Sequence, residues 1–108
     1  MSYDKNNIFA KIIRGEIPCK KVYENDYVLA FHDINPQKKV HVLVIPKGEY
    51  VDLDDFNNKA SDKEILELNK AVTHVANLMG TKNKGYRSLT NIGNDGGQEV
   101  PHLHFHIF

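Results

Sequence analysis

The sequence is short of cysteine, tryptophan and a surplus of either charge. Cys19 is the only cysteine among the 108 residues, so the chain can form no internal disulfide and offers no cysteine pair for zinc. A lone thiol is typical of a protein from a reducing compartment. Lysine plus arginine and aspartate plus glutamate both count 14. A protein that binds a nucleic-acid backbone needs an excess of positive charge, so we expect no nucleic-acid partner.

Long apolar runs and targeting signals are missing as well. No stretch approaches the ~20 apolar residues of a membrane span, and the opening "MSYDKNNIFA" lacks the apolar run of a signal peptide. We therefore expect a cytoplasmic protein with no membrane partner. The composition is 41% hydrophobic and 26% charged, as in globular chains. The length fits one domain over residues 1–108.

Residue patterns predict an α+β domain. We expect a short helix in "NNIFAKIIRGEIP", ended by Gly15, and a long helix from the capping pair Ser61 and Glu64 to Gly80. Short connections between strands favour an antiparallel sheet with the helices on one side. The β-prone runs are "KKVYE", "YVLAFHD", "VHVLVIP" (40–46), "YRSLTNI" (86–92) and "HLHFHIF" (102–108).

The last of these runs carries three of the six histidines, at every second position. On a strand, His102, His104 and His106 would share one face, and the apolar residues between them would share the other. A strand with some solvated histidines is one interpretation, although three in register are rare by chance. A metal site is the second, because two imidazoles at this spacing can reach one zinc ion. Further ligands would come from His41, His32, Asp33 or Glu99.

Nucleophilic catalysis is the third interpretation. Imidazole, with a pKa near ~6.5, is largely neutral at pH 7 and can attack phosphorus, which would form a phospho-histidine intermediate. Flanking donors would stabilise the charge that develops on the phosphate oxygens. The loop "NDGGQ" (94–98) leads into the histidines, and its backbone N–H groups could form an anion-binding nest. An ordinary tight turn is the alternative reading of that loop.

Several segments carry a resemblance to a known family. "HLHFHIF" fits the signature His-φ-His-φ-His-φ-φ (φ apolar) of the histidine triad (HIT) superfamily. The sequence resembles in particular its Hint branch, the purine nucleoside phosphoramidases, along nearly the whole chain. The other matching segments, in the same order, are "IFAKIIRGEIP", "LAFHDINPQ", "HVLVIPK" and "NIGNDGGQEVPHLHFH".

The resemblance implies a fold and an activity. The fold would be a five-stranded antiparallel sheet with two helices, and two subunits would pair into a ten-stranded sheet as a homodimer. The activity would be hydrolysis of the P–N bond of purine nucleoside 5′-phosphoramidates, so that the substrate is an AMP-type nucleotide. The reaction would need no cofactor and would pass through a covalent nucleotidyl intermediate on His104.

The resemblance also implies roles for individual residues. His102 and His106 would bind and orient the phosphate, and His41 matches a fourth histidine on the facing strand. Asn91 would lie near the phosphate, and Asp33 would accept hydrogen bonds from the ribose hydroxyls. The base pocket would consist of Ile8, Phe9, Ile12, Phe31, His32 and Ile34. The remaining expected substrate-binding residues are Gly97, Gln98 and Glu99.

The sequence departs from the Hint pattern at three places. Glu99 stands where many Hint proteins carry a serine that is linked to the leaving group, so the amine preference is expected to differ or the carboxylate to face solvent. Phe9 and Ala10 replace the region in which some bacterial relatives bind zinc through cysteines, and we predict no metal. The sequence ends at Phe108, where relatives continue into a tail that borders the partner's site.

Two other functions stay open at this point. One is hydrolysis of dinucleoside polyphosphates, another chemistry of the HIT superfamily. The other is a nucleotide-binding protein without catalysis, which the missing tail motivates. A uridylyltransferase is disfavoured, because that branch carries glutamine at the position of His106.

Overall fold

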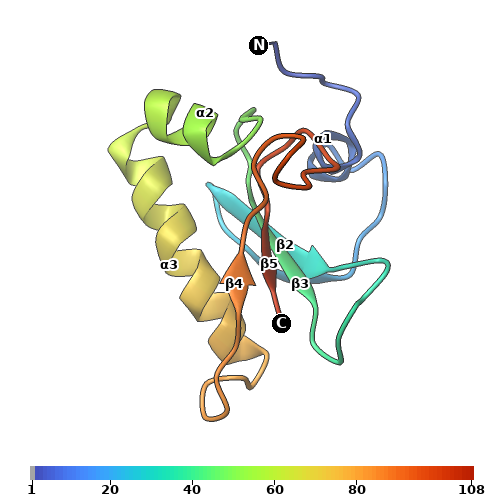
Figure 1. Ribbon diagram of the computed structural model, residues 1–108, viewed down its shortest axis with the longest axis vertical. Helices are drawn as coiled ribbons and strands as arrows, with labels where there is room; N and C mark the ends of the chain where they lie inside the picture. The colour runs from blue at the N-terminus through green and yellow to red at the C-terminus, as the bar shows by residue number, and fades with distance from the viewer. Residues whose placement is uncertain (1) are drawn as a thin grey trace.

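Five strands form one antiparallel sheet in the order β1-β2-β3-β5-β4 (Figure 1). This confirms the predicted α+β class and the five-stranded antiparallel sheet. The computed structural model describes residues 2–108. Its elements are α1 (Ile8–Ile13), β1 (Lys21–Glu24), β2 (Val28–His32), β3 (Val42–Pro46), α2 (Leu53–Lys59), α3 (Asp62–Leu78), β4 (Ser88–Leu89) and β5 (Phe105–Ile107).

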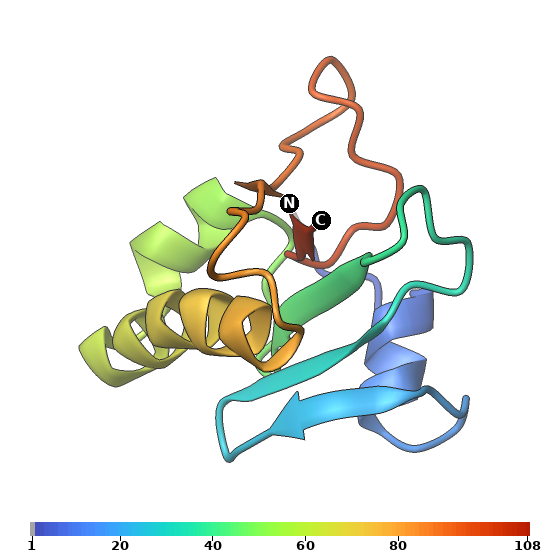
Figure 2. The same cartoon turned by 90° about the horizontal axis from the view of Figure 1, so that it is seen from below.

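Helices cover both faces of the sheet, so the prediction that they lie on one side is wrong. One face packs against α3, and the opposite face packs against α1 (Figure 2). The reason lies in the two central strands: alternating residues of β2 and β3 enter two separate cores, and both cores must be shielded from water. The α3 side holds Val28, Ala30, Val42 and Val44, and the α1 side holds Leu29, Phe31, Leu43 and Ile45.

The two predicted helices form where their end signals stand. Asn7 caps α1 by accepting a hydrogen bond from the Ala10 N–H. Ser61 and Glu64 form the predicted capping box at the start of α3. Among residues 2–108, no helix has the length and apolar character needed to cross a membrane.

The third helix, α2, was not predicted. It has seven residues, and Phe56 is its only buried one, so it lacks the apolar stripe that reveals longer helices. Its start is nevertheless signalled locally, because the Asp52 carboxylate accepts a hydrogen bond from the Asp55 N–H.

All five predicted strands are shorter in the structure, by one to five residues. The strand predicted at 86–92 is only Ser88–Leu89, the one at 40–46 begins at Val42, and the one at 102–108 is only Phe105–Ile107. Residues 102–104 leave the strand ladder because their N–H groups bond elsewhere: His102 N–H to the Val100 carbonyl at 2.9 Å and Leu103 N–H to the Tyr50 carbonyl at 2.9 Å. The first two histidines of the triad therefore precede the last strand.

Candidate active site

Four histidines gather on the α1 face of the sheet, where β3 and β5 pair. The pairing sets Leu43 opposite His106, and His41 lies directly before β3. The ring centroid of His106 is 5.0 Å from that of His104 and 5.2 Å from that of His41. The expectation that the triad shares one face is therefore met, although only His106 lies within a strand. Leu103 and Ile107 are fully buried in the opposite core, which fixes the alternation.

His102 is fully buried and both of its ring nitrogens are bonded. Nε2 lies 2.9 Å from the carbonyl oxygen of Pro46, and Nδ1 lies 2.5 Å from the hydroxyl of Tyr3. A carbonyl can only accept, so Nε2 carries the hydrogen and Nδ1 accepts from the tyrosine. No ring nitrogen of His102 is left to bind a phosphate, which differs from the role that the resemblance implied for it.

His104 has the opposite arrangement. Its Nδ1 lies 2.7 Å from the backbone carbonyl of His102, so Nδ1 carries the hydrogen and donates it. The second nitrogen, Nε2, then holds a lone pair, and it forms no hydrogen bond among residues 2–108. The ring packs edge-on against Phe9, with centroids 4.9 Å apart. An imidazole whose ring is fixed by a hydrogen bond and whose other nitrogen has a free lone pair can act as a nucleophile.

A second chain of hydrogen bonds sets the tautomer of His106. The Gln37 backbone N–H donates to His41 Nδ1 at 3.0 Å, so His41 Nε2 carries the hydrogen. That nitrogen lies 3.0 Å from His106 Nδ1 and 3.3 Å from the Asp33 carboxylate. Because His106 Nδ1 accepts, its own hydrogen lies on Nε2. His106 can therefore offer an N–H donor on a ring whose centroid is 5.0 Å from that of His104.

Burial keeps the triad neutral. The protein interior lowers the pKa of His102 to about 4, and the pKa of His106 is lowered to about 4 by burial and by the neighbouring His104 and His41. Burial also lowers the pKa of His104. Neutral rings have one hydrogen each, so the hydrogen-bond partners decide which nitrogen can react.

The structure brings together one group of metal-ligating atoms, from Asp33, His41 and His106, within 4.8 Å of one another. His32 and Glu99, the other ligands considered from sequence, are exposed and do not belong to this group. His41 would have to move its hydrogen from Nε2 to Nδ1 before it could bind a cation, and Nδ1 faces the Gln37 N–H. The group therefore fits hydrogen bonding better than metal binding.

The residues expected to bind the base separate into three environments. Phe9 and Phe31 are buried and contact each other edge-on, with ring centroids 5.7 Å apart. Ile12 packs half-buried beside them, and Ile8 is 41% exposed. Ile34 is 86% exposed on the loop after β2. His32 ends β2 exposed and points to the face opposite Phe31, so it lies apart from the cluster of Phe9, Phe31 and Ile12.

The loop before the triad is held by its own side chains. Gln98 accepts from the Gly93 N–H at 3.0 Å and donates to the carbonyls of Val51 and Val100 at 2.6 and 3.0 Å. The N–H groups of Gly97 and Gln98 themselves bond to loop carbonyls. Gln98 therefore shapes the loop, and these two N–H groups are not directed to an anion, which favours the turn interpretation over the nest. Glu99 is exposed.

Gly96 is required by a close approach of the backbone. A Cβ there would lie 2.3 Å from the Ile92 carbonyl oxygen, while the Gly96 carbonyl accepts from the Asn91 side chain at 2.7 Å. We predict that Gly96→Ala opens this turn and destabilises the protein by about 2 kcal/mol in urea denaturation. Asp95→Ala, an exposed change in the same loop, is the control. Equal stability of the two variants would contradict the prediction.

Three groups of the site were not predicted from the sequence: the Tyr3 hydroxyl, the Gln37 N–H and the Pro46 carbonyl. Two of them are backbone groups, which carry no side-chain signal in a sequence. Tyr3 lies 99 positions from its partner in a segment without a motif. Only the folded arrangement could reveal these contacts.

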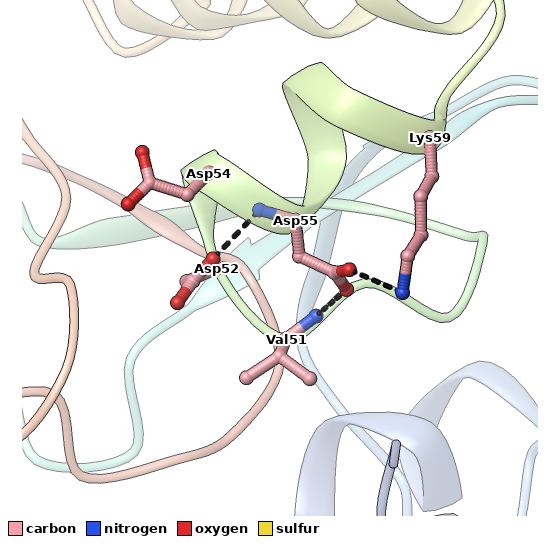
Figure 3. Close-up of a pocket in the computed structure, with 5 residues that line it drawn as sticks. All are labelled: Val51, Asp52, Asp54, Asp55 and Lys59. Carbon is pink, nitrogen blue, oxygen red and sulfur yellow. Dashed lines mark hydrogen bonds and ion pairs between the residues drawn. The ribbon is translucent and has the colours of Figure 1, made fainter. Parts of the chain in front are cut away.

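Two surface hollows are lined by residues other than the triad histidines. One, of about 300 Å³, is lined by Val51 and the start of α2 (Figure 3). Its Asp55 is paired with Lys59 at 2.8 Å and with the Val51 N–H at 2.9 Å, so its charge is already compensated. The other, of about 500 Å³, lies beside Phe108 and is lined by Lys38, Lys39, Val40 and Arg87.

This sheet, with a cluster of three alternating histidines and a fourth directly before the facing strand β3, defines a histidine triad domain. The model of the family described as "HIT domain" matches residues 14–108, and the chain belongs to that family. The chain is 60% identical over 107 residues to an uncharacterized 13.2 kDa HIT-like protein of Azospirillum brasilense, covering 99% of this chain and 88% of that protein.

Solved structures agree in fold. A HIT family hydrolase from Clostridium thermocellum superposes with a TM-score of 0.88 at 40% identity, covering 96% of this chain and 90% of that one. A histidine triad protein from Clostridium difficile gives a TM-score of 0.84 at 44% identity, covering 98% and 91%. Of these two structures, the one from Clostridium thermocellum is described as a hydrolase.

Proposed function

We propose that the protein hydrolyses purine nucleoside 5′-phosphoramidates through a nucleotidyl intermediate on His104. The single observation that supports this most is the bond from His104 Nδ1 to the His102 carbonyl at 2.7 Å. It leaves the lone pair on Nε2, the nitrogen without a hydrogen-bond partner among the described residues. Nucleophilic attack needs such a lone pair on a neutral ring.

In the first step, His104 Nε2 attacks phosphorus and the P–N bond breaks. The leaving nitrogen takes up a proton from solvent as the bond breaks, so that the amine departs as a neutral molecule with its electron pair. His106 keeps its proton, and we propose that its Nε2–H donates a hydrogen bond to the phosphate oxygens, in the tautomer that the 3.0 Å hydrogen bond from His41 Nε2–H to His106 Nδ1 fixes. In the second step, water attacks phosphorus and loses a proton to solvent, and the bond between phosphorus and His104 Nε2 breaks with its electron pair returning to Nε2. The products are the nucleoside monophosphate and neutral His104.

Substrate binding is proposed for the groups around this pair. The buried rings of Phe9 and Phe31 with the half-buried Ile12 offer an apolar wall for a purine, and Ile8 and Ile34 offer exposed apolar surface. Asp33 is half-buried and close to His41, which supports a role in holding ribose hydroxyls beside the reacting groups.

One observation favours the second candidate, hydrolysis of dinucleoside polyphosphates. The hollow of about 500 Å³ beside Phe108 is lined by Lys38, Lys39 and Arg87, which would attract further phosphates. The ring of Phe108 stacks on His106 with centroids 6.1 Å apart, so this basic hollow borders the proposed site.

The substrates separate the two candidates. We predict that an adenosine 5′-phosphoramidate is hydrolysed at least about tenfold faster, in kcat/KM, than a diadenosine polyphosphate. Both rates are measured by chromatography of the released nucleotides under the same conditions. The reverse order would favour the second candidate, and saturable AMP binding without turnover of either substrate would favour a binding protein.

We also propose a homodimer in which two sheets join edge to edge into ten strands. The strand order leaves β1 and β4 at the edges of the sheet, each with one side that pairs with no other strand among residues 2–108. A cytoplasmic location remains a proposal supported by the lone free thiol of Cys19.

A further inference from the structure

Tyr3 lies outside the segments that carry the triad and the residues proposed to bind the substrate. Its hydroxyl is 2.5 Å from His102 Nδ1, and the two rings meet edge-on at 71° with centroids 5.6 Å apart. The segment before α1 therefore contacts the first histidine of the triad, which lies 99 positions later in the sequence.

The segment that carries Tyr3 is fixed at several points. Asn7 binds the Asp4 carbonyl through its side-chain amide at 2.7 Å while its side-chain oxygen caps α1. Arg14, at the end of α1, donates to the Lys5 carbonyl at 2.8 Å. These bonds tie residues 4–7 to α1, so α1 and Tyr3 form one body that is placed against the triad.

The Tyr3 hydroxyl satisfies a nitrogen that no water can reach. His102 is fully buried, and its other nitrogen donates to the Pro46 carbonyl at 2.9 Å. If the hydroxyl were removed, Nδ1 would be a buried acceptor without a partner, and the ring could gain a partner only by turning or by shifting its hydrogen. Either change would break the bond to Pro46.

The orientation of His102 matters because its backbone carbonyl holds His104. Residues 102–104 lie outside the strand ladder, so their backbone is fixed by a few separate bonds and by the side chain of His102. A turn of that side chain would displace the carbonyl that accepts from His104 Nδ1 at 2.7 Å. The lone pair on His104 Nε2 depends on that acceptor.

We propose that Tyr3 is a positioning residue for the nucleophile: its hydroxyl locks His102, and the His102 carbonyl in turn holds His104 in the reactive tautomer. This proposal rests on the proposed function for the identity of the nucleophile. Tyr3 touches neither the reacting atoms nor, in this arrangement, the substrate. Its contribution is expected in the rate of the chemical step and not in nucleotide affinity.

Tyr3→Phe tests the proposal because it removes one oxygen and keeps the ring. We expect kcat on an adenosine 5′-phosphoramidate to fall about tenfold, with KM within about twofold of the parent value. Tyr27→Phe is the matched control, since Tyr27 is half-buried against the α3 core, on the face of the sheet opposite the α1 core. The control is expected to keep both constants.

A second measurement reads the imidazole nitrogens directly, without substrate. In ¹⁵N-labelled parent protein we expect His102 to be protonated on Nε2 and His104 on Nδ1, and in Tyr3→Phe we expect both rings to show mixed tautomers. If phosphoramidates are not substrates of the parent protein, the proposed function fails while this measurement still tests the Tyr3 contact.

Three results would overturn the positioning role. They are a parent protein with His102 protonated on Nδ1, a Tyr3→Phe variant with the parent tautomers, and a variant with altered tautomers but unchanged kcat. The first needs only the parent protein, so the proposal stays testable even if the variant does not fold.

Discussion

His104→Ala is expected to lose at least about 10⁴-fold in kcat on an adenosine 5′-phosphoramidate while it still binds AMP. The reason is that no other group can replace Nε2 as the attacking atom. The second nitrogen of His104 is engaged with the His102 carbonyl at 2.7 Å, both nitrogens of His102 are bonded, and His106 Nδ1 accepts from His41. AMP affinity is expected to rest on the proposed apolar wall of Phe9, Phe31 and Ile12, which the variant keeps.

Detection of the covalent nucleotidyl intermediate is the most direct test of this prediction. Parent protein quenched during turnover should carry an added AMP on the peptide 102–108, and His104→Ala should carry none. His74→Ala is the control, because His74 is exposed on α3 and contacts only the Tyr23 ring among the aromatic residues. An adduct on the His104→Ala protein, or a rate near that of the parent, would show that another residue attacks.

The histidine face could be predicted because alternation needs only local information. Leu103 and Ile107 are fully buried, and this alone sends the histidines between and beside them to the other side of the chain. The predicted strand was nevertheless too long. Whether residues 102–104 join a ladder depends on the Tyr50 and Val100 carbonyls, and their positions result from tertiary contacts.

The contact between His41 and His106 is non-local, since the two residues lie 65 positions apart. Hydrophobic patterns predict strands but not which strands pair, so only the family resemblance pointed to a fourth histidine. The tautomers of the histidines are harder still to predict from the sequence, because they depend on the Tyr3 hydroxyl and on backbone groups of Gln37 and Pro46.

The arrangement of the helices was wrong although a signal existed. β2 and β3 contain runs that are apolar at consecutive positions and buried on both faces. Such runs indicate strands covered on two sides, whereas a sheet with helices on one side would alternate apolar and polar residues. The short helix α2 is the opposite case, because its single buried residue, Phe56, leaves no period to detect.

Acid is expected to destabilise the protein before any carboxylate with a shifted pKa is protonated. The pKa of His102 is about 4 in the folded protein, against an ordinary value of ~6.5 in the unfolded chain. Above pH ~6.5 neither state binds the proton, so the full stability is present. Between pH ~6.5 and 4 the unfolded chain binds it and the folded protein does not. The free energy of unfolding therefore falls as the pH falls, by about 2 kcal/mol between pH 7 and pH 5 for this group.

His106 is expected to add a smaller loss of the same sign, because its pKa is also lowered to about 4 but its ring is only half-buried. The carboxylates act at lower pH: Glu24, with a pKa of about 2, and Asp55 and Glu64, whose pKa values are lowered by hydrogen bonds, lose their stabilising charge below the window between pH 7 and pH 5. The histidine contribution can thus be measured separately within that window.

Urea denaturation at intervals from pH 7 to pH 5 measures how the free energy of unfolding changes with pH. The slope gives the number of protons taken up on unfolding, and His102→Gln should reduce this number by about one while His74→Gln leaves it unchanged. Direct titration supports the comparison, because the His102 ring, with a pKa of about 4, should stay neutral down to pH ~5. A flat stability curve in the parent protein, or a His102 ring that takes up its proton near pH 6.5, would contradict the argument. It would mean that burial does not hold His102 neutral, and the fixed hydrogen on its Nε2 would then have no basis.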